Sequence, residues 1–310
     1  MSSELDPLAR TALWTASMRA REHDRKDRLF EEPLAALLAT DLGPKIMRSF
    51  EGEVQRGVED PALAVRTRFF DDAILQAAAH GGVGQIVLVA AGMDTRGYRL
   101  RLPPSTHLFE LDRPVLFELK RELLAEAGEQ ARVPVQMIGV DLLGDWIGPL
   151  LAGGFQPETP AVWLVEGLLY FLSPTERDRL LTEITATAAA GSLLLADYVT
   201  NASLDSEKMR SWREKMAASG HPWRSGCDDP HGLLGRLGWR TNVAAYGSAQ
   251  ADFGRWADAM IEPDTPATRG RYLISAVLES AVKAGEGGPH SERLDIDLAP
   301  NIAHDVRFDS

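Results

Sequence analysis

A turn of small residues, with a carboxylate about 20 residues beyond it, is the most suggestive chemical pattern in the sequence. The turn runs from Ala90 to Gly92 and follows the short apolar run 86–89. Asp112 ends a second strand-like run, and Glu110 stands two residues before it. Small residues after a strand let the backbone approach a ligand closely, while a carboxylate at the end of the next strand can accept from ribose hydroxyls. The pattern predicts a nucleoside site formed by Ala90, Gly92 and Asp112, with Glu110 as the reserve acid.

The same turn lacks the features that phosphate-bearing nucleotides require. It has neither the full G-x-G-x-x-G pattern of dinucleotide sites nor the lysine of nucleoside triphosphate loops. An adenosyl ligand without phosphates suits it better, and S-adenosylmethionine is the commonest of these. Asp94, just after the turn, is a good helix N-cap residue and could also reach the ammonium group of such a ligand. By spacing alone, a plain strand–turn–helix connection without a ligand is the alternative.

Five motifs between about residues 20 and 175 make the interpretation more specific. In chain order they are VRTRFFDD, AAGMDTRGYRL, FELD, VDL and VEGLLYFLSP. Together they resemble the leucine carboxyl methyltransferase family, most closely its bacterial branch of mycobacterial methyltransferases and tetracenomycin-type polyketide O-methyltransferases. The resemblance implies S-adenosylmethionine as cofactor. It also implies an α/β, class I Rossmann-like fold: a seven-stranded, mostly parallel sheet with helices on both faces, an N-terminal helical cap and a lid insertion.

The resemblance assigns expected roles to five further residues. Arg66 would bind the cofactor's carboxylate, and Arg21 would assist it. The alternative for Arg66 is a surface arginine packed along its aromatic neighbours, and the alternative for Arg21 is a solvated helix face. Asp141 would accept from the exocyclic amine of adenine and Leu142 would pack on its ring. Glu166, at the carboxyl end of the fourth strand, would contact the methionine moiety.

Composition limits the partners and the compartment. The formal net charge of −12 argues against a nucleic-acid backbone or an anionic membrane as partner, so a small-molecule substrate is expected. Cys227 is the only cysteine, the seven histidines are scattered without metal-ligand spacing, and no metal is expected. The sequence shows no secretory signal pattern and no apolar run of about 18 residues, so the cytoplasm is the expected location.

The chain divides by composition into a core and several additions. Strands are expected at 86–89, 108–112, 133–140, 161–165, 192–198, 239–245 and 271–278, the last two antiparallel at the sheet edge. Residues 41–60 are expected to be irregular, and the stretch between the last two strands, with Trp256 and Met260, is expected to be helical. The segment 200–236 is polar and too long for a simple connection, so it should be an insertion that covers the crevice, or else a surface subdomain unrelated to the substrate. The predicted parts are a helical cap contributing to the cofactor site (1–80), the cofactor-binding core (81–199), the insertion (200–236), the last strands (237–283) and a tail (284–310).

The resulting prediction is an S-adenosylmethionine-dependent O-methyltransferase. Its acceptor would be a carboxylate or hydroxyl of a small molecule, including polyketide-like natural products. The alternatives are carboxyl methylation of a peptide or protein C-terminus, and a protein that binds the cofactor without catalysis. A nicotinamide-dependent oxidoreductase is disfavoured because the turn lacks the glycine-rich pattern. No catalytic base is identified; His221, His231 and Tyr198 are candidates.

Overall fold

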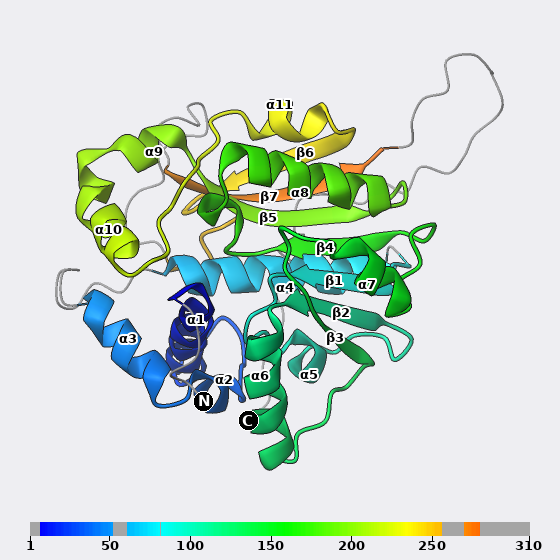
Figure 1. Ribbon diagram of the computed structural model, residues 1–310, viewed down its shortest axis with the longest axis horizontal. Helices are drawn as coiled ribbons and strands as arrows, with labels where there is room; N and C mark the ends of the chain where they lie inside the picture. Colours follow the sequence, from blue (N-terminus) through cyan, green and yellow to red (C-terminus); the bar gives the residue numbers. More distant parts are fainter. Residues whose placement is uncertain (1–6, 52–60, 81, 256–269, 280–310) are drawn as a thin grey trace.

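The computed structural model describes residues 7–51, 61–80, 82–255 and 270–279, which form a central sheet with helices on both faces (Figure 1). The strands are β1 (Gln85–Val89), β2 (His107–Asp112), β3 (Val135–Gly139), β4 (Ala161–Val165), β5 (Leu193–Val199), β6 (Trp239–Ala245) and β7 (Arg271–Leu278). The helices before β3 are α1 (Pro7–His23), α2 (Ala35–Ala39), α3 (Leu42–Glu51), α4 (Ala62–His80), α5 (Arg96–Arg99) and α6 (Pro114–Glu126). Those after it are α7 (Ile147–Ala152), the 3-10 helix η1 (Leu169–Phe171), α8 (Pro174–Thr187), α9 (Asn201–Asp205), α10 (Glu207–Ala218) and α11 (Pro230–Gly235).

The seven strands lie in the order β3-β2-β1-β4-β5-β7-β6. β1 to β5 are parallel, whereas β7 pairs antiparallel with both β5 and β6. This arrangement confirms the predicted fold class and the antiparallel edge. The strand order reverses between β1 and β4, and ligands of open α/β sheets bind outside the carboxyl ends of the strands at such a point.

The central strands are mainly apolar because helices cover both sides of the sheet, and Gln85 in β1 and Asp197 in β5 are polar exceptions. Every residue of β1, β4 and β5 is buried. Alternate side chains go to opposite faces, so Ile86 and Leu88 pack with α4 residues such as Phe69, while Val87 and Val89 pack with α7 and α8. The position of α4 against the sheet brings the start of that helix close to the ends of β4 and β5.

Two helical additions extend the sheet core, and helices α9 and α10 of the second lie on the same side of the molecule as the first (Figure 1). The N-terminal cap consists of α1, α2 and α3, and α1 also contacts α4. The insertion contains α9, α10 and α11 and returns to the sheet where the Cys227 backbone N–H donates to the Val199 carbonyl, 2.8 Å away. Among the described helices, none is both long enough and apolar enough to cross a membrane.

One expectation about local structure is corrected by the structure, and two fall outside the described residues. The segment 41–60 was expected to be irregular, but α3 forms within it because Leu42, Ile46 and Met47 have helical spacing, which places their apolar side chains on one face. The helix expected between β6 and β7, around Trp256 and Met260, lies outside the described residues. The same holds for the tail 284–310.

Candidate functional site

The turn after β1 and the acid that ends β2 are in direct contact. Both Ala90 and Gly92 have left-handed backbone conformations, with φ of 61° and 57°. One carboxylate oxygen of Asp112 accepts from the Gly92 N–H at 2.7 Å, and the other accepts from the Arg113 N–H at 2.7 Å. A left-handed alanine is strained, and such strain concentrates at ligand sites. The structure thus brings together the three residues that the sequence predicted for the ribose end of the site.

The cap helix α1 lies directly over this turn. A Cβ atom added to Gly92 would stand 3.3 Å from the Cβ of Ala12, so only a glycine leaves the present spacing between turn and helix undisturbed. Burial raises the pKa of Asp112, which the two backbone N–H groups only partly offset.

Glu110 does not face this part of the site. Its carboxylate forms an ion pair with the Lys120 ammonium of α6 at 2.6 Å, and both side chains are fully buried. Burial raises the pKa of Glu110 to about 7 despite this partner. The structure therefore places the Glu110 carboxylate beneath α6, paired with Lys120, and its reserve role stays an untested prediction.

The two residues predicted to hold adenine follow β3 at the same edge of the sheet. Asp141 is exposed, and its carboxylate accepts from the Leu143 N–H at 2.9 Å. Leu142 is half-buried and packs against the core. Their positions suit an adenine-binding loop, and their roles stay predictions.

Glu166, at the carboxyl end of β4, is surrounded by arginines. Its carboxylate pairs with Arg19 of α1 at 3.0 Å, with Arg66 of α4 at 2.9 Å and with Arg96 of α5 at 2.9 Å. Burial alone would raise the pKa of Glu166, but the three guanidinium groups outweigh it and hold the pKa far below its usual value. Glu166 is thus ionised at any physiological pH.

These contacts belong to a larger ionic network of buried side chains. Arg66 also pairs with Asp197 of β5 at 2.9 Å, Arg96 pairs with Asp94 and with Asp71 at 2.7 Å, and Arg99 links Asp71 to Glu32, each at 2.6 Å. No member is more than 11% exposed. The members of the ionic network are Arg19, Arg66, Arg96, Arg99, Glu32, Asp71, Asp94, Glu166 and Asp197.

Three of the nine members of the ionic network were predicted from the sequence, namely Arg66, Asp94 and Glu166, and the other six were not. Asp71, Arg96 and Arg99 stand inside the motifs VRTRFFDD and AAGMDTRGYRL, so their motif membership was the signal that could have found them. No comparable signal marked Asp197, because it belongs to none of the five motifs and is simply a single acid within an apolar strand.

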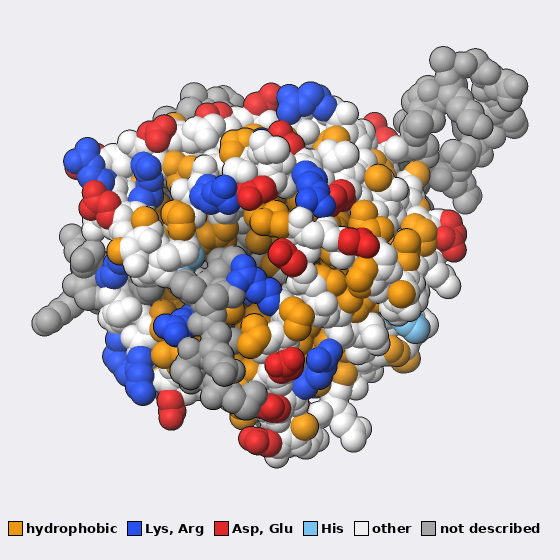
Figure 2. Space-filling view, viewed as in Figure 1, with side chains coloured by type: hydrophobic (Ala, Val, Ile, Leu, Met, Phe, Trp, Pro, Cys, Tyr) orange, Lys and Arg blue, Asp and Glu red, His pale blue; other side chains and the backbone are white. Residues whose placement is uncertain are grey.

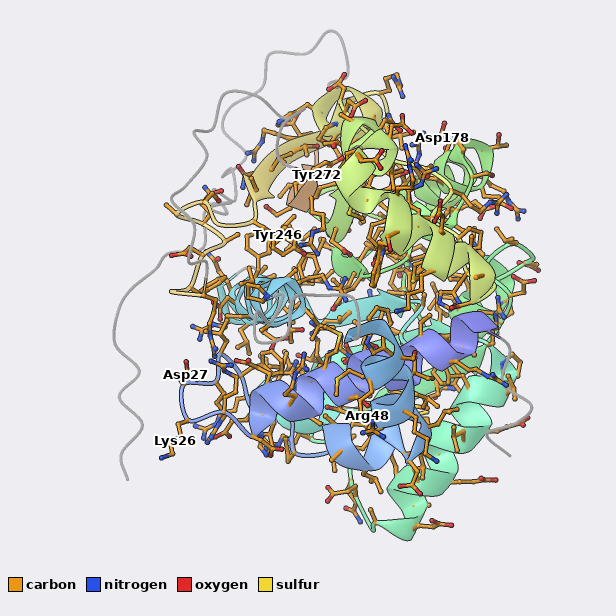
Figure 3. All side chains as sticks on the ribbon, turned by 90° about the vertical axis from the view of Figure 1, so that its left-hand side faces the viewer. Lys26, Asp27, Arg48, Asp178, Tyr246 and Tyr272 are labelled. Carbon is orange, nitrogen blue, oxygen red and sulfur yellow. The ribbon has the colours of Figure 1, made fainter. Side chains whose placement is uncertain are left out.

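Arg21 lies on a different side of α1 from Arg19. Two residues along a helix differ by about 200°, so the two side chains point in nearly opposite directions. Arg21 lines a separate cavity of about 230 Å³ together with Glu22 and Arg255. Figure 3 shows Asp27, which also lines this cavity, at the outer edge of the molecule. The structure therefore places Arg19, rather than the predicted Arg21, against Glu166.

An aromatic cluster joins the cap, the insertion and the segment that follows Glu166. Between ring centroids, Trp14 lies 5.6 Å from Trp212, Trp212 lies 6.0 Å from Trp223, and Trp223 lies 4.4 Å from Tyr170. Tyr170 contacts Phe171 at 4.8 Å, and Phe171 contacts His221 at 6.3 Å. The members of the aromatic cluster are thus Trp14, Tyr170, Phe171, Trp212, His221 and Trp223.

The aromatic cluster meets the ionic network at Tyr170. A Cβ atom added to Gly167 would stand 3.5 Å from both the Tyr170 hydroxyl and one guanidinium nitrogen of Arg66. The Tyr170 hydroxyl and the Arg66 guanidinium therefore flank the same turn. Burial raises the pKa of Tyr170, so its hydroxyl is neutral at physiological pH.

The three candidate bases have different surroundings. The Tyr198 hydroxyl is engaged in the core with Ser225 at 2.6 Å and Arg177 at 3.2 Å. His231 is exposed on α11, which packs against β6. His221 is buried beside Phe171, and burial lowers its pKa. Of these three, only His221 belongs to the aromatic cluster. The described residues contain no group of three or more His, Cys, Asp or Glu side chains arranged to hold a metal ion.

Comparisons with known proteins agree with these features. The sequence profile of the leucine carboxyl methyltransferase family matches residues 12–185. A relative from Parafrankia sp. (strain EAN1pec), provisionally named an S-adenosyl-L-methionine-dependent methyltransferase, is 38% identical over 239 residues, covering 75% of this chain and 77% of the relative. A relative of the same provisional name from Mycolicibacterium gilvum (strain PYR-GCK) is 38% identical over 253 residues, covering 76% of this chain and 81% of the relative.

Two solved structures share the fold at low sequence identity. A DUF574 family protein from Streptomyces avermitilis has a TM-score of 0.57 at 14% identity, over 84% of this chain and 96% of that chain. A protein from Thermobifida fusca, provisionally described as a methyltransferase, has a TM-score of 0.55 at 14% identity, over 77% of this chain and 89% of that chain. At this identity the similarity concerns the fold alone.

Proposed function

The chain belongs to the leucine carboxyl methyltransferase family, and we propose that it methylates an oxygen atom, carboxylate or hydroxyl, of a small aromatic molecule. It is a methyltransferase that uses S-adenosyl-L-methionine as cofactor. The nature of the acceptor is the part that we propose. The observation that carries it is the aromatic cluster beside the ionic network.

The residues of the site fit this cofactor. Within the part of the chain that the structure describes, the Nε of Arg19 and one terminal nitrogen of Arg96 are buried without a hydrogen-bond partner, so donors are present for the cofactor's carboxylate. Asp94 and Glu166 are buried acids that can accept from its ammonium group. We propose that Arg19 and Arg66 hold the amino acid end and that Asp112, with the turn from Ala90 to Gly92, holds the ribose.

The loop after β3 would hold the adenine, and we propose that Asp141 and Leu142 bind its ring.

Most of the catalysis would come from alignment of the cofactor's methyl group with the acceptor. The bound cofactor supplies a methyl group on a positively charged sulfur. The arginines fix the amino acid end, while the aromatic cluster excludes water and orients the acceptor, so that displacement occurs between two aligned reactants.

The requirement for a base depends on the acceptor. A carboxylate acceptor is already ionised and needs none. A hydroxyl acceptor must lose its proton to a base within about 3 Å. Because burial lowers the pKa of His221, this imidazole is neutral at physiological pH and can accept a proton, so we propose His221 as the base for a hydroxyl acceptor.

Aromatic side chains from three different parts of the chain support a planar acceptor, including polyketide-like compounds. Trp14, Trp212 and Trp223 are half-buried and offer ring faces suited to stacking. The net charge of −12 further favours a small molecule over nucleic acid or an anionic membrane. Acidic and basic side chains lie interspersed on the face shown in Figure 2.

An acceptor screen with methyl-labelled cofactor tests the proposal. The panel would contain aromatic carboxylic acids, phenols and a peptide ending in leucine. We expect label on an aromatic acid or phenol. Mild alkali releases methanol from a methyl ester but leaves an aryl methyl ether intact, which separates the two acceptor chemistries. A His221→Gln variant should lose transfer to phenols and keep transfer to carboxylates.

Two results would favour the alternatives. Label on the peptide alone would indicate carboxyl methylation of a peptide or protein C-terminus. Tight cofactor binding without transfer to any member of a broad panel would favour a protein that binds the cofactor without catalysis.

A further inference from the structure

The ionic network contains unequal numbers of positive and negative groups. Its ion pairs join four arginines to five carboxylates, so its formal charge is −1. An uncompensated buried charge is strongly unfavourable, and proteins normally balance it. The neighbouring Lys120 ammonium does not supply the balance, because it forms its own ion pair with Glu110.

Asp197 is one of the less compensated carboxylates of the ionic network. Among the described residues, Glu166 has three arginine partners, whereas Asp197, like Glu32 and Asp94, has one, which for Asp197 is Arg66 at 2.9 Å. The other oxygen of Asp197 accepts from the Gly167 N–H at 2.6 Å. Burial raises the pKa of Asp197, and one arginine does not overcome this effect. The buried Asp197 thus has capacity for a further positive charge.

Asp197 also stands where the reacting end of the site is expected. Val165 of β4 pairs in register with Ala196 of β5, so Glu166 and Asp197 follow at the same level on neighbouring strands. Asp197 fixes the turn at Gly167, beside Tyr170, where the ionic network meets the aromatic cluster. A positive charge bound between the network and the acceptor would therefore lie close to this carboxylate.

The cofactor and its product differ by one charge. S-adenosylmethionine carries a carboxylate, an ammonium and a sulfonium, which gives a net charge of +1. After methyl transfer the sulfonium becomes a neutral thioether, and S-adenosylhomocysteine has a net charge of zero. The charge of −1 in the site is neutralised when S-adenosylmethionine is bound and is left unneutralised when S-adenosylhomocysteine is bound.

We propose that Asp197 is a specificity-determining residue that makes the site prefer the cationic cofactor to the neutral product. The inference rests on the proposed methyl-transfer function, since it assumes that the cofactor's amino acid end lies in the ionic network. The unbalanced charge then promotes product release after each turnover. A neutral side chain at position 197 abolishes the preference but leaves the rest of the site in place.

Calorimetric titration with three ligands tests this proposal without any measurement of turnover. The probes are S-adenosylmethionine, S-adenosylhomocysteine and sinefungin, in which a protonated amine replaces the sulfonium centre. We expect the native protein to bind the two cationic ligands at least about tenfold more tightly than S-adenosylhomocysteine. In Asp197→Asn, whose amide oxygen can still accept from the Gly167 N–H, this ratio should fall to within about twofold of unity.

Asp112→Asn is the matched control. Asp112 is proposed to hold the ribose, which all three ligands share, so this variant should weaken all three alike and preserve the ratio. A native protein that binds S-adenosylhomocysteine as tightly as sinefungin would overturn the proposal, even if Asp197→Asn failed to fold. An unchanged ratio in a folded Asp197→Asn would overturn it as well. Failure of all three ligands to bind would instead contradict the proposed cofactor site.

Discussion

At the scale of single residues, the site is defined by which arginine meets which carboxylate. Buried ion pairs contribute little net stability, because desolvation offsets their attraction. They do fix orientation, and Arg19, Arg66 and Arg96 all point at Glu166. This preformed arrangement suits the proposed binding of a zwitterionic ligand by the ionic network better than it suits a stabilising role.

The contrast between Arg19 and Arg21 gives a test at this scale. Arg19→Gln should weaken S-adenosylhomocysteine binding by about 1.5–3 kcal/mol, the range for losing a hydrogen bond to a charged group. Arg21→Gln is the matched control on the same helix and should leave the affinity within about 0.5 kcal/mol of the native value. Calorimetric titration of both variants provides the measurement. Weaker binding in Arg21→Gln alone would restore the role predicted for Arg21.

At the scale of elements, β2 and α6 are joined by a charged pair inside an otherwise apolar contact. Glu110 of β2 and Lys120 of α6 are fully buried, and the ammonium also lies 5.9 Å from the centroid of the Phe117 ring. A buried pair of this kind fixes how α6 is placed on the sheet. Since Asp112 ends the same strand, it also fixes the position of the proposed ribose acid.

Because of this pair, the free energy of unfolding of the protein should fall as pH rises. The folded pKa of Glu110, about 7, exceeds its usual value of 4.5, so between these values the folded protein retains a proton that the unfolded chain has lost. The contribution of Glu110 to stability therefore falls as pH rises through this window. Its unfavourable effect on the free energy of unfolding, on the order of 3 kcal/mol, should develop between about pH 4.5 and pH 7 and level off above that range.

Urea unfolding of the native protein and of Glu110→Gln/Lys120→Met would measure this dependence. The double variant lacks the titrating pair, so the native protein should lose stability relative to it from pH 5 to pH 8. Each single variant should lose about 3–5 kcal/mol, because it leaves one buried polar partner uncompensated, whereas the double variant should lose far less. Parallel pH profiles for the native and double-variant proteins would contradict the assignment.

At the scale of the whole molecule, the proposed site depends on two additions to a common sheet. The cap supplies Arg19 and covers the Gly92 turn, while the insertion supplies Trp212, His221 and Trp223. The rings of Trp14 and Trp212 connect the two additions directly. Cap and insertion should therefore open and close over the site together.

Hydrogen exchange can detect this coupling. Trp212→Ala removes the contacts with Trp14 and Trp223, so amide exchange should accelerate in both α10 and α1, with opening free energies reduced by about 1–3 kcal/mol. Exchange in β1 and β4 should not change. Arg210→Ala, an exposed position on the same helix, is the control and should leave both helices at native rates. Acceleration confined to α10 would show that the cap and the insertion move independently.

Much of the fold follows from local patterns in the chain. The continuous apolar runs predicted the buried parallel strands, and the turn from Ala90 to Gly92 with Asp112 predicted one end of the site. These features were predictable because a strand's burial and a turn's backbone conformation depend mainly on neighbouring residues. The apolar run 161–165 likewise predicted that Glu166 follows the end of the fourth strand.

Only the tertiary structure decided which charged groups meet. Arg66 and Glu166 are 100 positions apart in the chain, and Asp197 joins them from a third segment, so no local pattern relates the three. The packing of α1 against the sheet selected Arg19 over Arg21, since a shift of two residues on a helix reverses the direction of the side chain. The packing of α6 over β2 pairs Glu110 with Lys120, although Glu110 shares a strand face with Asp112. Spacing along the chain identifies groups that can carry charge, but packing determines their distances and burial, and electrostatic energy depends on both.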